Sequence, residues 1–193
     1  MEIYLARHGQ DEDNEKGILN GHRDLPLTDL GRQQAEDAAA LIKAKGIHFD
    51  VVLASPLKRA FETAEIISKK SGQPKPISHP LLIERDFGVM TGRPASTIAL
   101  ECSPDIVKTD TITYFLKPDG AETFPDLLQR ARVLLNSLDE TYDASDTLLL
   151  VGHGDMGKMI YAAHYDLDWK TVLKKFHFGN AELLHLSQNP VSQ

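Results

Sequence analysis

The chain has 193 residues, of which 41% are hydrophobic and 25% are charged, and its formal net charge is -7. These values are typical of one folded globular domain and exclude a disordered or fibrous protein. The negative charge argues against non-specific attraction to nucleic acid or to an anionic membrane. Any site for an anion must therefore be a local cluster of positive groups.

The sequence predicts a cytoplasmic protein. Its first residues, Met1-Glu2-Ile3, do not resemble a secretory signal, and no stretch approaches the length of a membrane-spanning helix. Cys102 is the only cysteine, so neither an intrachain disulfide nor a cysteine-based metal cluster can form, and the histidines lack zinc-site spacing. We expect no metal, no cofactor, and neither nucleic acid nor membrane as a partner. A homodimer is left open.

The first predicted element is a buried strand that ends in a functional turn. Apolar and β-favouring side chains at residues 3–6 lead directly into Arg7, His8 and Gly9. In open α/β sheets, ligands bind just beyond the carboxyl ends of strands, and this is where His8 falls. Alone, such a tripeptide is more often an ordinary polar strand end, so its role depends on what the rest of the chain supplies.

A polar, acidic segment over residues 10–15 separates this strand from a turn at Asn20-Gly21. Its acidic residues resemble a calcium-binding loop, but Gly17 falls one place too late for that template and no glutamate closes the loop. Asn14 lies close to His8 along the chain and carries an uncharged amide donor. Its alternative role is that of a turn former.

Two helices with a strand between them are predicted next. The first helix begins after Thr28, its expected cap. The strand is the apolar run 51–54, and Ser55-Pro56 directly after it is expected to cap a second helix over residues 57–70. Arg59 lies on the first turn of that helix, from which it can face the sheet edge where the first strand ends.

The pattern becomes irregular after the second helix. Residues 76–83 are predicted to form a strand that its prolines place near the edge of the sheet, with Glu84 at its end. From about 85 to 120, glycines, prolines and threonines are scattered. We interpret this stretch as a lid-like excursion over the site, with some local helix, inside a single domain of residues 1–193.

The second half of the chain returns to alternating helix and strand. Residues 125–138 show an amphipathic helical pattern, and residues 147–151 are an uninterrupted apolar run typical of a central parallel strand. Gly152-His153-Gly154 comes directly after this run, and two further helices and a final strand follow. The alternation predicts a three-layer α/β/α sandwich with a mostly parallel central sheet.

Four residues capable of chemistry, His8, Arg59, Glu84 and His153, fall at or just past predicted strand ends. With their neighbours they resemble the histidine phosphatase, or phosphoglycerate mutase-like, superfamily. The matching residues are Arg7-His8-Gly9, Asn14, Asn20-Gly21, Leu27-Thr28, Gly31, Ala35, Ser55-Pro56-Leu57, Arg59-Ala60, Thr63-Ala64, Glu84, Phe87-Gly88 and His153-Gly154. They occur in the family's order, and the resemblance is weakest over 92–120. It implies a phosphoglycerate mutase-like fold.

The resemblance also implies a mechanism. His8 would be a nucleophile that carries the phosphoryl group as phosphohistidine. Arg7, Arg59 and a protonated His153 would hold the phosphate oxygens, so that no metal is needed. Glu84 would be the general acid toward the leaving group and the base toward water. Further substrate-binding residues are Asn14, Gly21 and Gly154, and the alternative acids are Asp11, Asp13 and Asp86.

Within this superfamily we expect hydrolysis. Where the mutases carry a tyrosine and a lysine, this chain has Phe87 and Ala95, and it has no adjacent arginine pair. These differences from the mutases remove partners for a substrate carboxylate or second phosphate, although Arg93 or Lys117 could restore some charge. The favoured function is therefore a phosphatase acting on a small phosphate monoester, such as a sugar phosphate. The alternative is a 2,3-bisphosphoglycerate-dependent phosphoglycerate mutase.

Two hypotheses of another class remain open. Residues 152–159 match the G-x-x-x-x-G-K pattern of a nucleotide-binding P-loop, except that Met159 stands where serine or threonine would hold magnesium. A protein that binds phosphate esters without catalysis is the other alternative. Dependence on a metal would distinguish the first hypothesis from a phosphohistidine enzyme, and hydrolysis of an aryl phosphate would exclude the second.

Overall fold

The centre of the protein is a five-stranded sheet, and a computed structural model describes it together with the rest of residues 1–187. The strand order is β3-β2-β6-β1-β7, with β1 (Glu2–Arg7), β2 (Val51–Ala54), β3 (Ile77–Ser78) and β6 (Thr147–Gly152) parallel and β7 (Leu183–Leu186) antiparallel. β1 and β6 pair along their whole length, ending with Arg7 opposite Gly152. The residues that follow these two strands are therefore neighbours.

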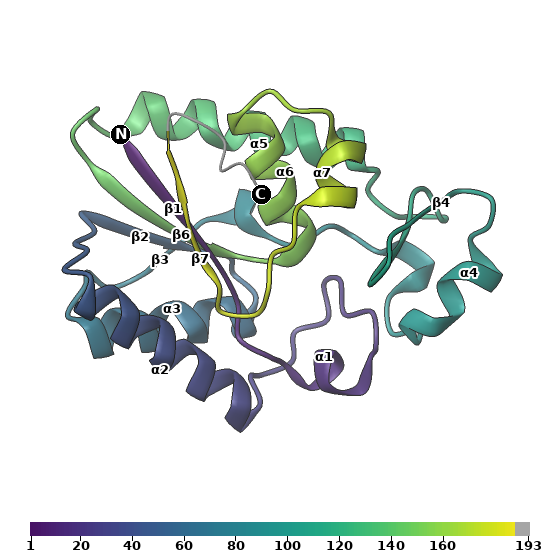
Figure 1. Cartoon of the computed structure of the whole chain (residues 1–193), viewed down its shortest axis with the longest axis horizontal. Coiled ribbons are helices and arrows are strands. Elements are labelled where there is room, and N and C mark those ends of the chain that lie inside the picture. Colours follow the sequence, from purple (N-terminus) through teal and green to yellow (C-terminus); the bar gives the residue numbers. More distant parts are fainter. Residues whose placement is uncertain (188–193) are drawn as a thin grey trace.

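Helices cover both faces of the sheet (Figure 1). On one face lie α2 (Asp29–Ala44) and α3 (Lys58–Ser71), and on the other lie α5 (Phe124–Thr141), α6 (Gly154–His164) and α7 (Trp169–Lys175). Leu148 and Leu150 of β6 join one core, and Leu149 and Val151 join the other, because successive side chains of a strand point to opposite faces. The predicted three-layer α/β/α architecture is confirmed. No helix within residues 1–187 is both long and apolar enough to cross a membrane.

Residues 85–123 form a lobe that projects from the sheet, on the right in Figure 1. The lobe contains 3-10 turns at Gly88–Met90 and Ala95–Thr97, the short helix α4 (Ile98–Glu101) and a hairpin of β4 (Ile106–Lys108) and β5 (Thr113–Phe115). Phe87, Met90, Ile98 and Phe115 are buried together as its own small core. The sequence predicted local helix here but not the hairpin.

β3 is shorter than the strand predicted at 76–83. It lies at the edge of the sheet, as expected, but spans only Ile77–Ser78. Pro80 has no amide hydrogen for the strand ladder and begins a 3-10 turn at Pro80–Leu82 instead. Glu84 therefore follows this turn and not the end of a strand.

Ser55 does not cap α3, contrary to the prediction. α3 begins at Lys58, and its N-cap residue is Leu57, whose side chain makes no capping bond. Ser55 is fully buried; its Oγ accepts the Leu57 amide at 3.3 Å and lies 2.7 Å from Nε2 of His153. The hydroxyl that the sequence assigned to a helix terminus therefore contacts a histidine of the candidate site.

Candidate active site

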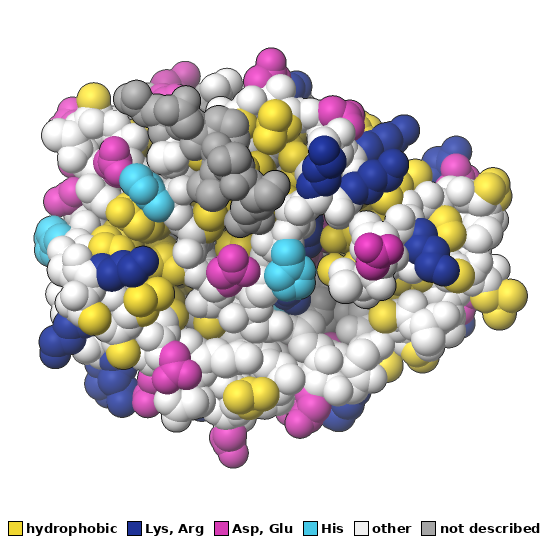
Figure 2. Space-filling model, viewed as in Figure 1, with side chains coloured by type: hydrophobic (Ala, Val, Ile, Leu, Met, Phe, Trp, Pro, Cys, Tyr) yellow, Lys and Arg dark blue, Asp and Glu magenta, His cyan; other side chains and the backbone are white. Residues whose placement is uncertain are grey.

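A cavity of about 410 Å³ lies between the lobe and the carboxyl ends of the central strands, and Figure 2 shows the surface hollowed beside the lobe. Its polar wall includes Arg7, His8, Asn14, Glu84 and Gly154, all of which the sequence predicted as site residues. The facing wall belongs to the lobe and is mostly apolar; it includes Phe87, Ile98, Ile112, Tyr114 and Phe115. Segments far apart in the sequence thus meet at one cavity.

His8 is fixed directly after β1 by bonds to neighbouring backbone. Its amide donates to the carbonyl oxygen of Gly152 at 2.9 Å, and its Nδ1 donates to that of Gly9 at 2.6 Å. Because a carbonyl oxygen only accepts, the proton lies on Nδ1 and the lone pair on Nε2. Burial, with Arg59 and Arg7 nearby, lowers the pKa of His8 well below its usual value. The ring is therefore a neutral imidazole whose Nε2 carries a free lone pair.

Gly9 is required by the close approach of two backbone segments. A Cβ atom on Gly9 would lie 2.2 Å from the carbonyl oxygen of Gly31, and one on Gly31 would lie 2.0 Å from that of Gln10. The turn after β1 can rest on the first turn of α2 only if both residues are glycine. The Gly9 amide also donates to Oγ1 of Thr63 on α3, at 3.1 Å. Two helices therefore fix the position of His8.

Arg7 and Asn14 contribute donors that have no acceptor among residues 1–187. Nη1 of Arg7 donates to the carbonyl oxygen of Phe178 at 2.9 Å, whereas its Nε is buried without a partner. Oδ1 of Asn14 accepts from Nδ2 of Asn180 at 3.2 Å, and the side-chain Nδ2 of Asn14 has no acceptor among residues 1–187. Unpaired donors in a cavity wall are costly unless a ligand accepts from them, and here an anion fits.

Gly154 begins α6 and gives the cavity a helix N-terminus. A Cβ atom at this position would lie 3.6 Å from the guanidinium carbon of Arg7, so the two residues are in close contact. The first amides of a helix have no acceptor within it, and together with the helix dipole they favour an anion. The amides of Asp155 and Met156 donate to Glu84, so the Gly154 amide remains for a ligand.

Glu84 is held at the N-terminus of α6. Its Oε1 accepts from the amides of Arg85, at 2.9 Å, and Met156, at 3.1 Å, and its Oε2 accepts from the amide of Asp155 at 3.3 Å. Burial, followed by the nearby charge of Asp155, raises the pKa of Glu84 even though these bonds oppose the shift. A carboxyl group that keeps its proton to higher pH is suited to act as a general acid.

Arg130 of α5 fixes the backbone that carries Glu84. Its Nη1 donates to the carbonyl oxygens of Leu81 and Ile83 at 2.8 and 2.7 Å, and its Nη2 donates to that of Glu84 at 3.2 Å. The guanidinium also forms a two-pronged ion pair with Glu122, at 2.9 and 2.7 Å. Sequence reasoning did not identify this residue, because nothing in an amphipathic helix pattern shows which loop an arginine binds.

His153 lies beside His8, with ring centroids 5.1 Å apart. Its Nε2 contacts Ser55, and its Nδ1 is buried without a partner among the described residues. Burial, with Arg59, His8 and Arg7 nearby, lowers the pKa of His153 well below its usual value. The ring is therefore neutral in the protein alone, whereas the sequence resemblance implies a cation. A phosphate dianion beside it would raise this pKa again.

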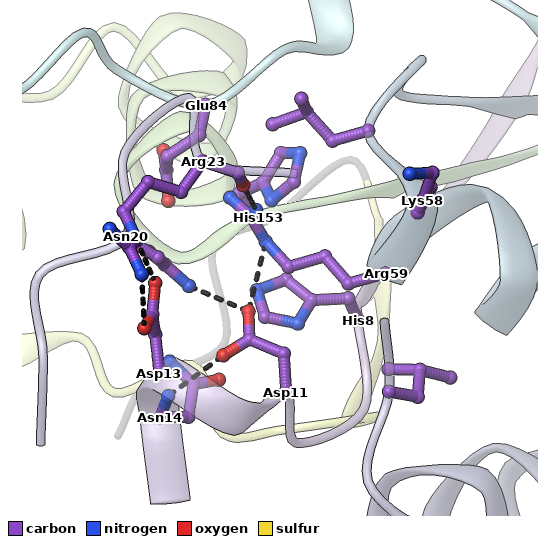
Figure 3. Close-up of polar contacts among 12 residues, drawn as sticks. His8, Asp11, Asp13, Asn14, Asn20, Arg23, Lys58, Arg59, Glu84 and His153 are labelled. Atoms are coloured by element: carbon purple, nitrogen blue, oxygen red, sulfur yellow. Dashed lines mark hydrogen bonds and ion pairs between the residues drawn. The ribbon is translucent and has the colours of Figure 1, made fainter. Parts of the chain in front are cut away.

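Arg59 lies beside His8 (Figure 3), but it is not among the residues that line the cavity. Its Nε lies 3.2 Å from Oδ2 of Asp11, in an ion pair whose two side chains are 0% exposed. Its Nη1 and Nη2 donate to the carbonyl oxygens of Arg23, at 2.6 Å, and Gly21, at 2.8 Å. Gly21, expected to contact substrate, also lies outside the cavity lining and instead helps to hold Arg59.

The carboxylates considered as alternative acids all have fixed partners. Asp11 accepts from the Asn14 amide and caps α1 (Glu12–Lys16). Asp13 pairs with Arg23 at 2.7 Å, and Asp86 accepts from the Gly88 amide at 2.8 Å. Within residues 1–187, no three His, Cys, Asp or Glu side chains gather as a metal site. Unlike these three carboxylates, Glu84 lines the cavity, so it is better placed than they are to exchange a proton with a ligand.

Asp11→Ala is expected to lower the free energy of unfolding by about 3–5 kcal/mol, because it leaves the buried guanidinium of Arg59 without its counter-charge. Urea unfolding followed by circular dichroism measures this change. The matched control is Glu36→Ala, which removes a half-exposed carboxylate 2.8 Å from Lys70 and is expected to cost less than about 1 kcal/mol. An equal loss in the two variants would contradict the role of the buried pair.

The P-loop hypothesis for residues 152–159 does not fit the structure. β6 ends at Gly152 and α6 begins at Gly154, so His153 alone connects them. A P-loop needs a longer turn whose successive amides surround the phosphates. Lys158 lies within α6, where it lines the cavity described above.

Known structures support the fold. The chain superposes on the mycobacterial glucosyl-3-phosphoglycerate phosphatase with a TM-score of 0.79 at 23% identity, covering 95% of this chain and 88% of that one. It superposes on the phosphoserine phosphatase of Entamoeba histolytica with a TM-score of 0.73 at 24% identity, covering 95% and 89%. At these identities the likeness concerns the fold alone.

Sequence comparisons show the family. A 2,3-bisphosphoglycerate-dependent phosphoglycerate mutase of Methylobacterium sp. (strain 4-46) is 35% identical over 158 residues, which cover 79% of this chain and 75% of the relative. The corresponding enzyme of Azorhizobium caulinodans is 29% identical over 188 residues, covering 95% and 90%. The model of the histidine phosphatase superfamily, branch 1, matches residues 3–191. The chain belongs to the histidine phosphatase superfamily.

Proposed function

We propose that this protein is a metal-independent phosphatase that hydrolyses small phosphate monoesters through a phosphohistidine on His8. The observation that carries the proposal is the state of this side chain. Its proton is held on Nδ1 by the Gly9 carbonyl, and its lowered pKa keeps Nε2 unprotonated at neutral pH. A neutral imidazole beside the unpaired donors of Arg7 and Asn14 is arranged to attack a bound phosphoryl group.

In the first step, Nε2 of His8 attacks phosphorus and the bond from phosphorus to the ester oxygen breaks. The leaving oxygen takes the proton of Glu84, so that an alcohol departs and not an alkoxide. Arg7, Asn14 and the Gly154 amide donate to the phosphoryl oxygens. His8 then carries the phosphoryl group, and Glu84 is an ionised carboxylate.

In the second step, a water molecule gives a proton to Glu84 and its oxygen attacks phosphorus. The bond from phosphorus to Nε2 of His8 breaks, inorganic phosphate leaves, and both side chains return to their starting state. Arg7 supplies positive charge in the cavity wall, so the steps need no metal ion.

The mutase alternative is favoured by the names of the curated relatives. It would need groups that hold a second acidic part of a phosphoglycerate. Arg93 and Lys117, which the sequence left as candidates, do not line the cavity; they pair with Glu101 at 3.8 Å and Asp105 at 3.4 Å. Neither of these two residues therefore supplies that contact in the cavity.

The test is to incubate the purified protein with EDTA and either p-nitrophenyl phosphate or 3-phosphoglycerate. We expect inorganic phosphate from one or both esters, in amounts that exceed the enzyme and without 2-phosphoglycerate. Formation of 2-phosphoglycerate without phosphate release would establish the mutase alternative. Binding of vanadate without turnover of either ester would identify a non-catalytic binding protein.

A further inference from the structure

We propose that Lys158 is a second binding point in the cavity, for an acidic group on the alcohol part of the substrate. The inference rests on the proposed phosphatase function and narrows its substrates to phosphate monoesters that carry a carboxylate or a further phosphate. Lys158 entered the sequence analysis only as part of the P-loop pattern, and the mechanism above does not use it.

Lys158 lies one helical turn after Gly154 on α6, so the two residues share a face of the helix. Its side chain is only 3% exposed, and it lines the same cavity as His8. Because Gly154 contacts Arg7 at the phosphate-binding end, Lys158 occupies the next position along the cavity wall. An ester held by Arg7 would bring its alcohol part close to this lysine.

The ammonium group of Lys158 has no acceptor in the described part of the chain. No hydrogen bond or ion pair within residues 1–187 uses its Nζ, and its one specific contact is with the ring of Tyr114, 5.5 Å from the centroid. Lysine is almost never this deeply buried without a partner, because removing an ammonium ion from water is costly. A ligand in the cavity is therefore the missing partner.

Nearby carboxylates do not neutralise Lys158 because they are bound elsewhere. Asp155, one turn before it, forms an ion pair with Nε of Arg85 at 2.9 Å. Glu84 accepts from the Arg85 amide and from two amides at the start of α6, those of Asp155 and Met156. Burial and the charge of Arg7 lower the pKa of Lys158, while Asp155 and Glu84 oppose the shift. A bound acid would reverse this shift and stabilise the ammonium ion.

The chemistry of the subsite selects an anion. An ammonium group is a compact point charge that binds a carboxylate or a phosphate, and a neutral sugar hydroxyl cannot compensate it. Tyr114 also lines the cavity, and its hydroxyl can donate to an acid. The facing wall contributes the apolar side chains of Ile98, Ile112 and Phe115, which cannot bind an acid. The cavity thus has a phosphate end and, beside it, a place for a second acid at Lys158.

Lys158→Met tests this inference, because methionine keeps the length of the side chain and removes its charge. The first substrate pair is 3-phosphoglycerate and glycerol 3-phosphate, which differ by a carboxylate in place of a hydroxymethyl group. The second pair is fructose 1,6-bisphosphate and fructose 6-phosphate. In at least one pair, we expect the variant to lose about 10- to 100-fold in kcat/KM for the acidic member and threefold or less for the other.

Binding measured by calorimetry tests the same point without turnover. The ligands are 3-phosphonopropionate and propylphosphonate, and only the carboxylate ligand should bind about 10-fold or more weakly to Lys158→Met. Lys158→Arg should retain much of the preference, and Lys174→Met, an exposed lysine on α7, should change neither affinity. Thermal unfolding of each variant controls for folding.

The outcomes separate this inference from the proposed function. Equal effects of Lys158→Met on acidic and neutral members, in kinetics and in binding, would overturn the second subsite even if the protein is a phosphatase. Failure of the unaltered protein to hydrolyse any ester would contradict the proposed function. In that case the phosphonate pair still decides whether Lys158 recognises an acid.

Discussion

His8→Ala is expected to lower kcat/KM for every phosphate ester by about 10⁴-fold or more, because the variant has no nucleophile and transfer to water must occur directly. Phosphate release from p-nitrophenyl phosphate measures the loss. The cavity retains Arg7, Asn14 and Gly154, so we expect vanadate or phosphate to bind the variant. Loss of catalysis with retention of anion binding distinguishes a missing nucleophile from a collapsed site.

The matched control for this variant is His164→Ala. His164 is the last residue of α6 and is exposed, so its removal should leave kcat/KM within about twofold. Activity of His8→Ala above about one tenth of the unaltered protein would rule out His8 as the nucleophile. A His8→Ala variant that unfolds at a much lower temperature than the control would be replaced by His8→Gln for the comparison.

Glu84→Gln is expected to affect substrates according to their leaving groups. Alkyl phosphates should lose about 10²–10⁴-fold in kcat/KM, because an alkoxide cannot leave without a proton. p-Nitrophenyl phosphate should lose far less, since p-nitrophenolate is a stable anion. kcat/KM is the right measure because it reports the step in which the leaving group departs, and not the later hydrolysis of phosphohistidine.

Asp86→Asn is the control for Glu84→Gln. Asp86 lies two residues after Glu84 and does not line the cavity, and its Oδ1 accepts from the Gly88 amide. Its substitution should leave the ratio of alkyl to aryl rates unchanged. Equal losses for both kinds of ester in Glu84→Gln would reject Glu84 as the acid.

The roles of His8 as nucleophile and Glu84 as acid also predict how kcat/KM changes with pH. Turnover of alkyl phosphates requires His8 unprotonated and Glu84 protonated. The lowered pKa of His8 keeps the nucleophile available below the ordinary histidine value of about 6.5. Because Glu84 must be protonated, kcat/KM falls as the pH rises through the raised pKa of Glu84. Glu84→Gln should lose this falling limb, and its persistence would point to another acid.

The layers of the fold were predictable because they depend on local patterns. The apolar run ending at Val151 is uninterrupted because both faces of β6 are covered, and Thr28 does cap α2 as expected. The placement of His8 and His153 side by side follows from the parallel pairing of β1 and β6. The alternation of strands and helices predicts a mostly parallel sheet, but it does not say which strands pair.

Other features depend on contacts that no local pattern contains. Asn180 bonds to His8 and Asn14 only because β7 lies antiparallel beside β1. Arg85 is the residue after Glu84, yet its ion pair with Asp155 joins two distant segments. The bonds of Asn180 and the ion pair of Arg85 are long-range contacts between segments that are unremarkable by themselves. The hairpin in the lobe is instead a local pairing, with Lys108 opposite Thr113, and it lies in a stretch whose scattered glycines, prolines and threonines give no strand pattern.

The central claim is that the phosphoryl group passes through Nε2 of His8. Rapid mixing with a labelled phosphate ester, quenching in alkali and mass spectrometry of the digested protein test it most directly. We predict a phosphoryl group on His8 alone, formed within the first turnover and lost as substrate is exhausted. A phosphoryl group on any other residue, or sustained turnover without a phosphorylated protein, would contradict the account.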